Sequence, residues 1–102
     1  MKKITYEMLK KGWDADVVRL SVDPCSPDGK GTVAQIGERH AENYFFFGGE
    51  TAEDMTPEEY KKNVPEEDIL KEILATLDDF NETEGFEDEY ELYYLYLKEV
   101  AA

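Results

Sequence analysis

The chain contains one cysteine and one histidine, the side chains best suited to nucleophilic or metal-assisted chemistry. Cys25 and His40 could form a nucleophile–base pair, but no third residue is placed to orient them, and Cys25 lies in a turn-rich segment. His40-Ala41-Glu42 matches the first half of a zinc deaminase signature, whose second half is Pro-Cys-x-x-Cys. Pro24-Cys25-Ser26-Pro27 lies upstream and offers one thiol. We therefore expect a surface loop around His40 and no metal site.

The segment Asp79-Phe80-Asn81-Glu82-Thr83 begins like a calcium-binding loop, with oxygen ligands at alternate positions. An EF-hand loop counted from Asp79 needs glycine at its sixth residue and glutamate at its twelfth. Those positions hold Glu84 and Tyr90. We do not expect a specific calcium site.

Two glycine-containing segments, 28–31 and 47–50, lack the length and spacing of phosphate-binding loops and are better explained as turns. Carboxylates are abundant, but acid catalysis requires a desolvated pair in a cleft. Acids crowded on exposed helices do not meet that requirement. The sequence therefore predicts a protein that is not an enzyme and that carries no cofactor.

The strongest signal in the sequence is an uneven distribution of charge. Residues 1–49 contain seven Lys/Arg and seven Asp/Glu, whereas residues 50–102 contain four and eighteen, so the second half carries the whole net charge of -14. Eight of these acids, and no Lys or Arg, lie within residues 78–91. Such charge repels nucleic acid and anionic membranes and attracts basic surfaces, including those of proteins that bind nucleic acid. Solubility alone is the simpler explanation, but it does not require so lopsided a distribution.

We predict that this acidic stretch docks on a basic protein surface. Carboxylates four residues apart on a helix, such as Glu87 and Glu91, stand about 6 Å apart and repel each other, so crowding them lowers stability. A row of this kind can engage Lys and Arg side chains that normally hold phosphates, and tyrosines can add aromatic anchors. The alternative is that the tyrosines complete the core and the acids are merely solvated. The predicted contact residues are Asp78, Asp79, Glu82, Glu84, Glu87, Asp88, Glu91, Tyr90 and Tyr94.

The size and composition of the chain predict one folded domain. It has 102 residues, of which 41% are hydrophobic and 13% aromatic, too rich a content for a disordered chain. A lone cysteine excludes an internal disulfide framework. The N-terminus shows no secretory signal and no segment has the length of a membrane span, so we expect a cytoplasmic protein.

The first half predicts a short helix followed by three strands. Thr5 can cap the helix, and Gly12 is expected to end it in a left-handed turn. Alternating residues predict strands at 15–22, 32–36 and 43–47, joined by polar connections that are typical of an antiparallel meander. Because the third strand is aromatic on both faces, we expect it to be central or covered on both sides.

The second half changes to helical periodicity. Thr56-Pro57-Glu58-Glu59 is a capping box with proline at the first helical position, and it opens a short helix. Val64-Pro65 ends that helix, and apolar stripes then predict helices over 66–80 and 86–99. The expected fold is α+β, with helices packed on one face of a three-stranded antiparallel sheet in the order αβββααα. The last helix has more apolar residues than one stripe can bury, leaving over Leu92, Tyr94, Leu95 and Tyr96.

In element order, and in its acidic C-terminal half with the run Glu87-Asp88-Glu89-Tyr90-Glu91, the chain resembles the small acidic anti-CRISPR proteins that mimic DNA. The resemblance lies in architecture and charge, without an aligned motif. It implies that the acidic face around residues 82–91 occupies the DNA-binding site of a nuclease. The neutral first half departs from uniformly acidic mimics, so any mimicry is expected to be one-sided.

The surplus apolar surface of the last helix favours an alternative function. In this interpretation the chain is a small structural or regulatory domain that forms a homodimer through that helix, and its acidity serves solubility. Neither interpretation includes direct binding of nucleic acid or of a membrane.

Overall fold

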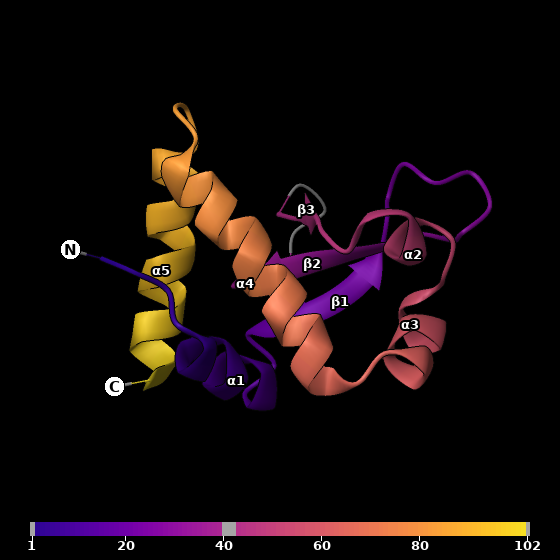
Figure 1. Cartoon of the computed structure of the whole chain (residues 1–102), viewed down its shortest axis with the longest axis horizontal. Helices are drawn as coiled ribbons and strands as arrows, with labels where there is room; N and C mark the ends of the chain where they lie inside the picture. The colour runs from indigo at the N-terminus through magenta and orange to yellow at the C-terminus, as the bar shows by residue number, and fades with distance from the viewer. Residues whose placement is uncertain (1, 40–42, 102) are drawn as a thin grey trace.

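The computed structural model describes residues 2–39 and 43–101 of the chain. The predicted α+β fold is confirmed, with a helix, a three-stranded antiparallel sheet and then further helices (Figure 1). A short helix, α2, precedes the three predicted C-terminal helices and was not expected from the sequence. The elements are α1 (Tyr6–Asp14), β1 (Val18–Val22), β2 (Thr32–Ile36), β3 (Phe45–Phe46), α2 (Gly49–Glu53), α3 (Pro57–Asn63), α4 (Glu66–Glu82) and α5 (Glu87–Ala101).

The central strand of the sheet is β2, which pairs antiparallel with β1 on one side and β3 on the other. Residues paired across neighbouring strands point to the same face of a sheet. The pairs Val18–Ile36, Leu20–Ala34 and Ala34–Phe45 therefore build one apolar face, and all five side chains are buried.

The prediction that the third strand is central or covered on both sides is wrong. β3 is a short edge strand, and Phe46 on its outer face is 57% exposed. Phe46 packs edge-on against Tyr44, with 5.7 Å between the ring centroids. The aromatic residues of the outer face thus cover one another in part.

The apolar face of the sheet is covered by α1, α4 and α5. In Figure 1, α4 crosses in front of the sheet, α5 lies beside it, and α1 packs against both helices. The buried side chains of α4 follow the apolar stripe that the sequence predicted for residues 66–80. The buried side chains are Leu9 of α1, Ile69, Leu70, Ile73 and Leu77 of α4, and Tyr90, Tyr93 and Leu97 of α5.

Local capping signals were also predicted correctly. Thr5 caps α1, since its hydroxyl accepts the N–H of Met8 at 3.2 Å. The capping box of α3 is complete: Thr56 Oγ1 accepts the N–H of Glu59, and the Glu59 carboxylate accepts the N–H of Thr56, both at 3.2 Å. The hydrogen bond from the Thr56 backbone N–H, followed by that from the Thr56 side chain, lowers the pKa of the Glu59 carboxyl.

The predicted role of Gly12 is wrong, because α1 continues through it to Asp14. The left-handed residue that follows the helix is Asp16, with φ 60°. Gly12 is buried where α1 approaches α5 and β1 closely: a Cβ there would lie 2.7 Å from Leu97 Cδ2 and 2.9 Å from Val18 Cγ2. The glycine therefore permits close packing between elements that are far apart in the sequence.

We predict that Gly12→Ala destabilises the protein by about 1–3 kcal/mol, because an added methyl group overpacks the contact between α1 and α5. A glycine-to-alanine change inside an unconstrained helix would instead stabilise it by about 1 kcal/mol. Urea unfolding measures the difference. The exposed neighbour Lys11 provides the control, since Lys11→Ala is expected to change stability by less than about 0.5 kcal/mol. A stabilised Gly12→Ala variant would contradict this account of the packing.

Candidate docking surface

The predicted partner-binding acids gather where α4 passes into α5. We call residues 78–91 the acidic tip. α4 and α5 are joined at one end of the molecule, on the side of α4 away from α3 (Figure 1). Asp78 is half-buried, and the other seven carboxylates of the acidic tip are exposed. The eight are Asp78, Asp79, Glu82, Glu84, Glu87, Asp88, Glu89 and Glu91.

Aromatic packing holds the acidic tip in place. Phe80 near the end of α4 stacks on Phe86 just before α5, with 4.9 Å between centroids and an angle of 5° between the rings. Phe80 also meets Phe45 of β3 edge-on, at 5.6 Å between centroids. Phe45 in turn packs against Tyr93 of α5 at 5.3 Å. This chain of rings fixes the acidic tip to the sheet.

Hydrogen bonds of backbone and side-chain groups shape the turn between the two helices. Thr83 donates its hydroxyl to the carbonyl of Asp79 at 2.6 Å and its N–H to the carbonyl of Phe80 at 3.2 Å. Gly85 has φ 99°, a conformation that L side chains rarely adopt, and its N–H donates to the Glu87 carboxylate at 3.0 Å. These hydrogen bonds thus define the backbone conformation of the turn.

Most of the acidic tip has no cationic partner. In the part of the chain that the structure describes, Glu91 forms an ion pair with Lys2, and the hydrogen bond from Lys2 to Glu91 raises the pKa of Lys2. No Lys or Arg nitrogen of those residues lies within 4.0 Å of the other seven carboxylates. Lys10 binds Glu66 at 2.6 Å, but at the opposite end of α4. The first half therefore neutralises little of the acidic tip.

The helix dipole separates two groups of acids within the acidic tip. Glu87, Asp88 and Glu89 lie in the first turn of α5, where the positive end of the dipole stabilises acids. Residues 78, 79 and 82 lie near the C-terminus of α4, where the dipole opposes acids, and the last turn of α4 contains no basic residue. Helix stability therefore does not explain the acids at the end of α4.

One of the predicted contact residues, Tyr90, does not lie on the surface. This side chain is 4% exposed, and its hydroxyl oxygen accepts the N–H of Ile4 at 2.7 Å, so it anchors the N-terminal segment to α5. Tyr90 shares the buried face of α5 with Tyr93, whose pKa is raised by burial. Tyr94 is half-buried against the edge of the core. The alternative that the tyrosines complete the core is correct for Tyr90.

Within α5, two large apolar side chains are left exposed by the core. Leu92 and Leu95 are each 48% exposed, and Tyr94 and Tyr96 are half-buried. The surplus apolar surface predicted for this helix is therefore present, but two leucines account for most of it. The spacing of three residues between them was visible in the sequence.

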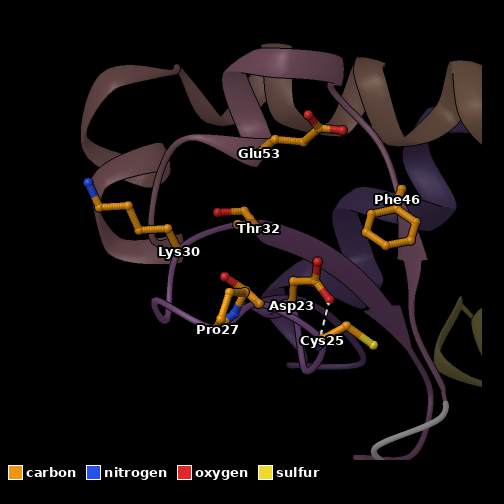
Figure 2. Close-up of a pocket in the computed structure, with 9 residues that line it drawn as sticks. Asp23, Cys25, Pro27, Lys30, Thr32, Phe46 and Glu53 are labelled. Atoms are coloured by element: carbon orange, nitrogen blue, oxygen red, sulfur yellow. Dashed lines mark hydrogen bonds between the residues drawn. The ribbon is translucent and has the colours of Figure 1, made fainter.

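Cys25 lies on a surface pocket of about 390 Å³ (Figure 2). Its sulfur is 3.8 Å from the hydroxyl of Tyr44, and its backbone N–H donates to the carboxylate of Asp23 at 2.9 Å. Asp23 thus holds the backbone of the loop at Cys25. His40 and Glu42 lie outside the described residues, so the absence of a Cys–His pair stays a prediction.

The calcium-like segment from Asp79 does not form a loop. Residues 79–82 belong to the last turn of α4, which spreads their oxygens around the helix and does not let them converge. Among residues 2–39 and 43–101, no group of three or more His, Cys, Asp or Glu side chains is placed to hold a metal ion.

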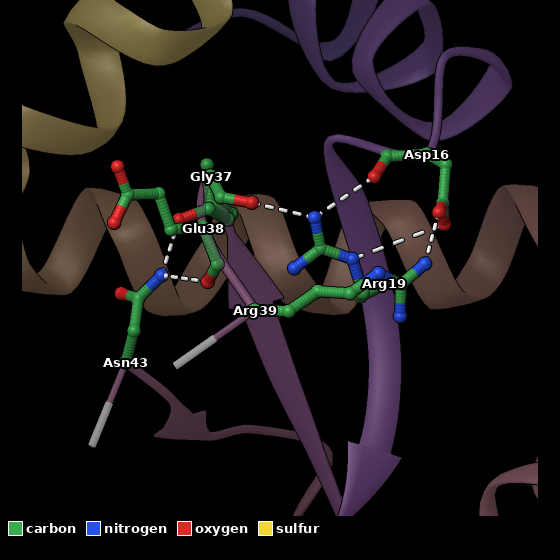
Figure 3. A network of polar contacts seen from close by, with 7 residues as sticks. Asp16, Arg19, Gly37, Glu38, Arg39 and Asn43 are labelled. Carbon is green, nitrogen blue, oxygen red and sulfur yellow. Dashed lines mark hydrogen bonds and ion pairs between the residues drawn. The ribbon is translucent and has the colours of Figure 1, made fainter. Parts of the chain in front are cut away.

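A buried guanidinium, which the sequence did not predict, lies on the other face of the sheet (Figure 3). Arg19 is 8% exposed, and its Nη2 donates to the carbonyls of Asp16, at 2.9 Å, and Gly37. Burial, together with the nearby charge of Arg39, lowers the pKa of Arg19. Arg39 in turn pairs with Asp16. The network joins the segment after α1 to the segment after β2, and Arg19 does not line the pocket beside Cys25.

Comparisons with protein-family models, with curated proteins and with solved structures give no match for this chain. None of the helices described is long and apolar enough to cross a membrane.

We predict that neutralising the acids at the end of α4, with D78N/D79N/E82Q, raises Tm by about 4 °C or more at low salt. These changes remove both like-charge repulsion and an unfavourable interaction with the helix dipole. The matched control, E87Q/D88N/E89Q, removes the same number of charges from the acidic tip but loses a favourable dipole interaction at the start of α5, so it is expected to gain less stability or to lose stability. Equal shifts for both variants would contradict the dipole argument. Thermal unfolding at 20 mM and 500 mM salt measures both.

Proposed function

We propose that this chain is a non-enzymatic binding protein whose acidic tip docks on a basic protein surface. The partner surface is the nucleic-acid-binding site of an enzyme such as a nuclease, and the chain inhibits it as a DNA mimic. The observation that carries the proposal is the group of seven carboxylates without a Lys or Arg partner, within the described residues, on a turn fixed by aromatic packing.

The chemistry of phosphate recognition supports this choice of partner. Proteins hold a nucleic-acid backbone with Lys and Arg side chains spaced to meet regularly repeated charges. Carboxylates one helical turn apart, such as Asp78 and Glu82 of α4, offer negative charges about 6 Å apart. Because the rings of Phe80 and Phe86 fix the turn before any partner binds, docking requires little further ordering of the acidic tip.

The distribution of charge over the helices also supports the acidic tip as the docking site. Residues 50–63, which include α2 and α3, contain two Lys and five Asp/Glu. Residues 64–102, which include α4 and α5, contain two Lys and thirteen Asp/Glu. The negative electrostatic field of the molecule is therefore strongest on the side of α4 and α5. A basic partner is attracted to this side first.

The resemblance to DNA-mimicking anti-CRISPR proteins favours a CRISPR nuclease as the enzyme inhibited. It consists of the shared element order and the acidic C-terminal half, and the neutral first half makes the proposed mimicry one-sided. An inhibitor of this kind works in the cytoplasm, where its target meets DNA.

A second candidate function is that of a small regulatory domain that self-associates through α5. The exposure of Leu92 and Leu95 favours it. Size-exclusion chromatography with light scattering tests it directly, because a monomer at all concentrations removes this candidate.

DNA cleavage by purified CRISPR nucleases, with and without the chain, tests the main proposal. We predict inhibition by competition with DNA, with an affinity that falls by about 100-fold between 50 and 200 mM salt, since each contact replaces a phosphate contact. A variant with four acids of the acidic tip neutralised should lose at least about tenfold in affinity. This tip variant is D79N/E82Q/E84Q/D88N.

The matched control removes four exposed charges from residues 50–58, in α2, its C-cap and α3, and it spares Glu59, which caps α3. It is E50Q/E53Q/D54N/E58Q, and we expect it to change the affinity by less than about threefold because screened charges far from the contact contribute little. Equal losses for both variants, or inhibition indifferent to salt, would overturn the proposal.

A further inference from the structure

The outward face of α5 carries an apolar pair between two acids. Residues at positions i, i+4, i+7 and i+11 of a helix share one face, and Asp88, Leu92, Leu95 and Glu99 have this spacing, all of them exposed. We call these four residues the outer stripe. The inner face of the same helix holds Tyr90, Tyr93 and Leu97, so the core does not need the outer leucines. α5 lies at the margin of the molecule in Figure 1.

The outer stripe is continuous with the acidic tip. Asp88 belongs to both, and Leu92 follows it by one helical turn. A partner held by the acidic tip therefore lies close to the two leucines. An exposed leucine by itself is ordinary, but two adjacent leucines at the border of a proposed docking surface offer the apolar centre that protein interfaces use as an anchor.

The charges around the leucines disfavour a second copy of this chain. If two α5 helices paired antiparallel with Leu92 against Leu95, Asp88 of one copy would face Glu99 of the other. Parallel pairing would place each of these acids against itself. Both arrangements bring like charges together between molecules that each carry a net charge of -14. Lys98 is the one basic residue of α5. In the antiparallel pair it would lie on the side of Glu91 of the other copy, but Glu91 is already paired with Lys2.

The same charges favour a basic partner. Asp88 and Glu99 are eleven residues apart on α5, which corresponds to roughly 16 Å along the helix. A partner segment that places Lys or Arg at both ends of an apolar pair matches this pattern of acid, leucine, leucine and acid. A basic amphipathic helix has this arrangement on one face.

We infer that the outer stripe of α5 binds a basic amphipathic helix of the partner, with Leu92 and Leu95 as its apolar anchor. This inference rests on the proposed function, because it names the partner chemistry for the same docking surface. The acidic tip attracts and orients the partner, which is the usual effect of charge complementarity, and the leucines slow its dissociation.

Two synthetic helical peptides test the inference. Both carry the same Lys residues at the two ends of one face, and between them one has a pair of leucines and the other a pair of serines. Binding is measured by fluorescence anisotropy with the wild-type chain, with L92Q/L95Q, and with the tip variant D79N/E82Q/E84Q/D88N. L92Q/L95Q changes exposed side chains, and its unfolding temperature serves as the check on folding.

We expect the wild-type chain to bind the leucine peptide about tenfold more tightly than the serine peptide, which corresponds to about 1.4 kcal/mol. L92Q/L95Q should bind both peptides equally, with the salt dependence of the wild type retained. The tip variant should lose affinity for both peptides but keep the preference for leucine.

The outcomes separate the inference from the proposed function. Equal, salt-dependent binding of both peptides by the wild-type chain would overturn the inference and leave the proposed function standing. Binding of neither peptide, or binding indifferent to salt, would overturn both. A wild-type dimer that L92Q/L95Q converts to a monomer would assign the outer stripe to a second copy and would also overturn the inference.

Discussion

The packing of Phe80 is the interaction on which the acidic tip depends. This ring stacks on Phe86 across the turn and meets Phe45 of the sheet edge-on, so it ties the turn to the core. Eight carboxylates lie within the fourteen residues around it, and their mutual repulsion favours an open turn. Aromatic pairs of this kind contribute about 0.5–1.5 kcal/mol each beyond the area that they bury. The protein thus holds concentrated negative charge on a rigid support, which is the property that an electrostatic docking surface needs.

The two faces of α5 have different tasks. Tyr90, Tyr93 and Leu97 bind this helix to the rest of the fold, and the hydroxyl of Tyr90 also fixes the N-terminal segment through Ile4. The opposite face presents apolar and acidic side chains that the core does not use. Cations from the first half pair with Glu91 of α5 and with Glu66 at the start of α4, and they leave the turn between the two helices uncompensated. Stability and the proposed binding therefore draw on different residues of the same helix.

Features that depend on neighbours in the sequence could be predicted from the sequence alone. The capping box at Thr56, the strand Thr32–Ile36 and the buried stripe of α4 are of this kind, and the location of the excess acid followed from simple counting. The errors concern contacts between distant segments. A glycine often ends a helix, but Gly12 lies inside α1 and permits the close approach of α1 to α5. Whether the aromatic third strand is central depends on which strands pair, and whether Tyr90 is buried depends on the N-terminal segment that covers it.

Zero-length carbodiimide cross-linking of the inhibited complex tests the central claim most directly, because it joins a carboxylate of this chain to a lysine of the partner only where the two are in contact. Mass spectrometry then identifies the linked residues. The account predicts cross-links from carboxylates between Asp78 and Glu91, with fewer at higher salt. Cross-links concentrated at residues 50–59 of α2 and α3, or spread evenly over the acids of the molecule, would contradict it.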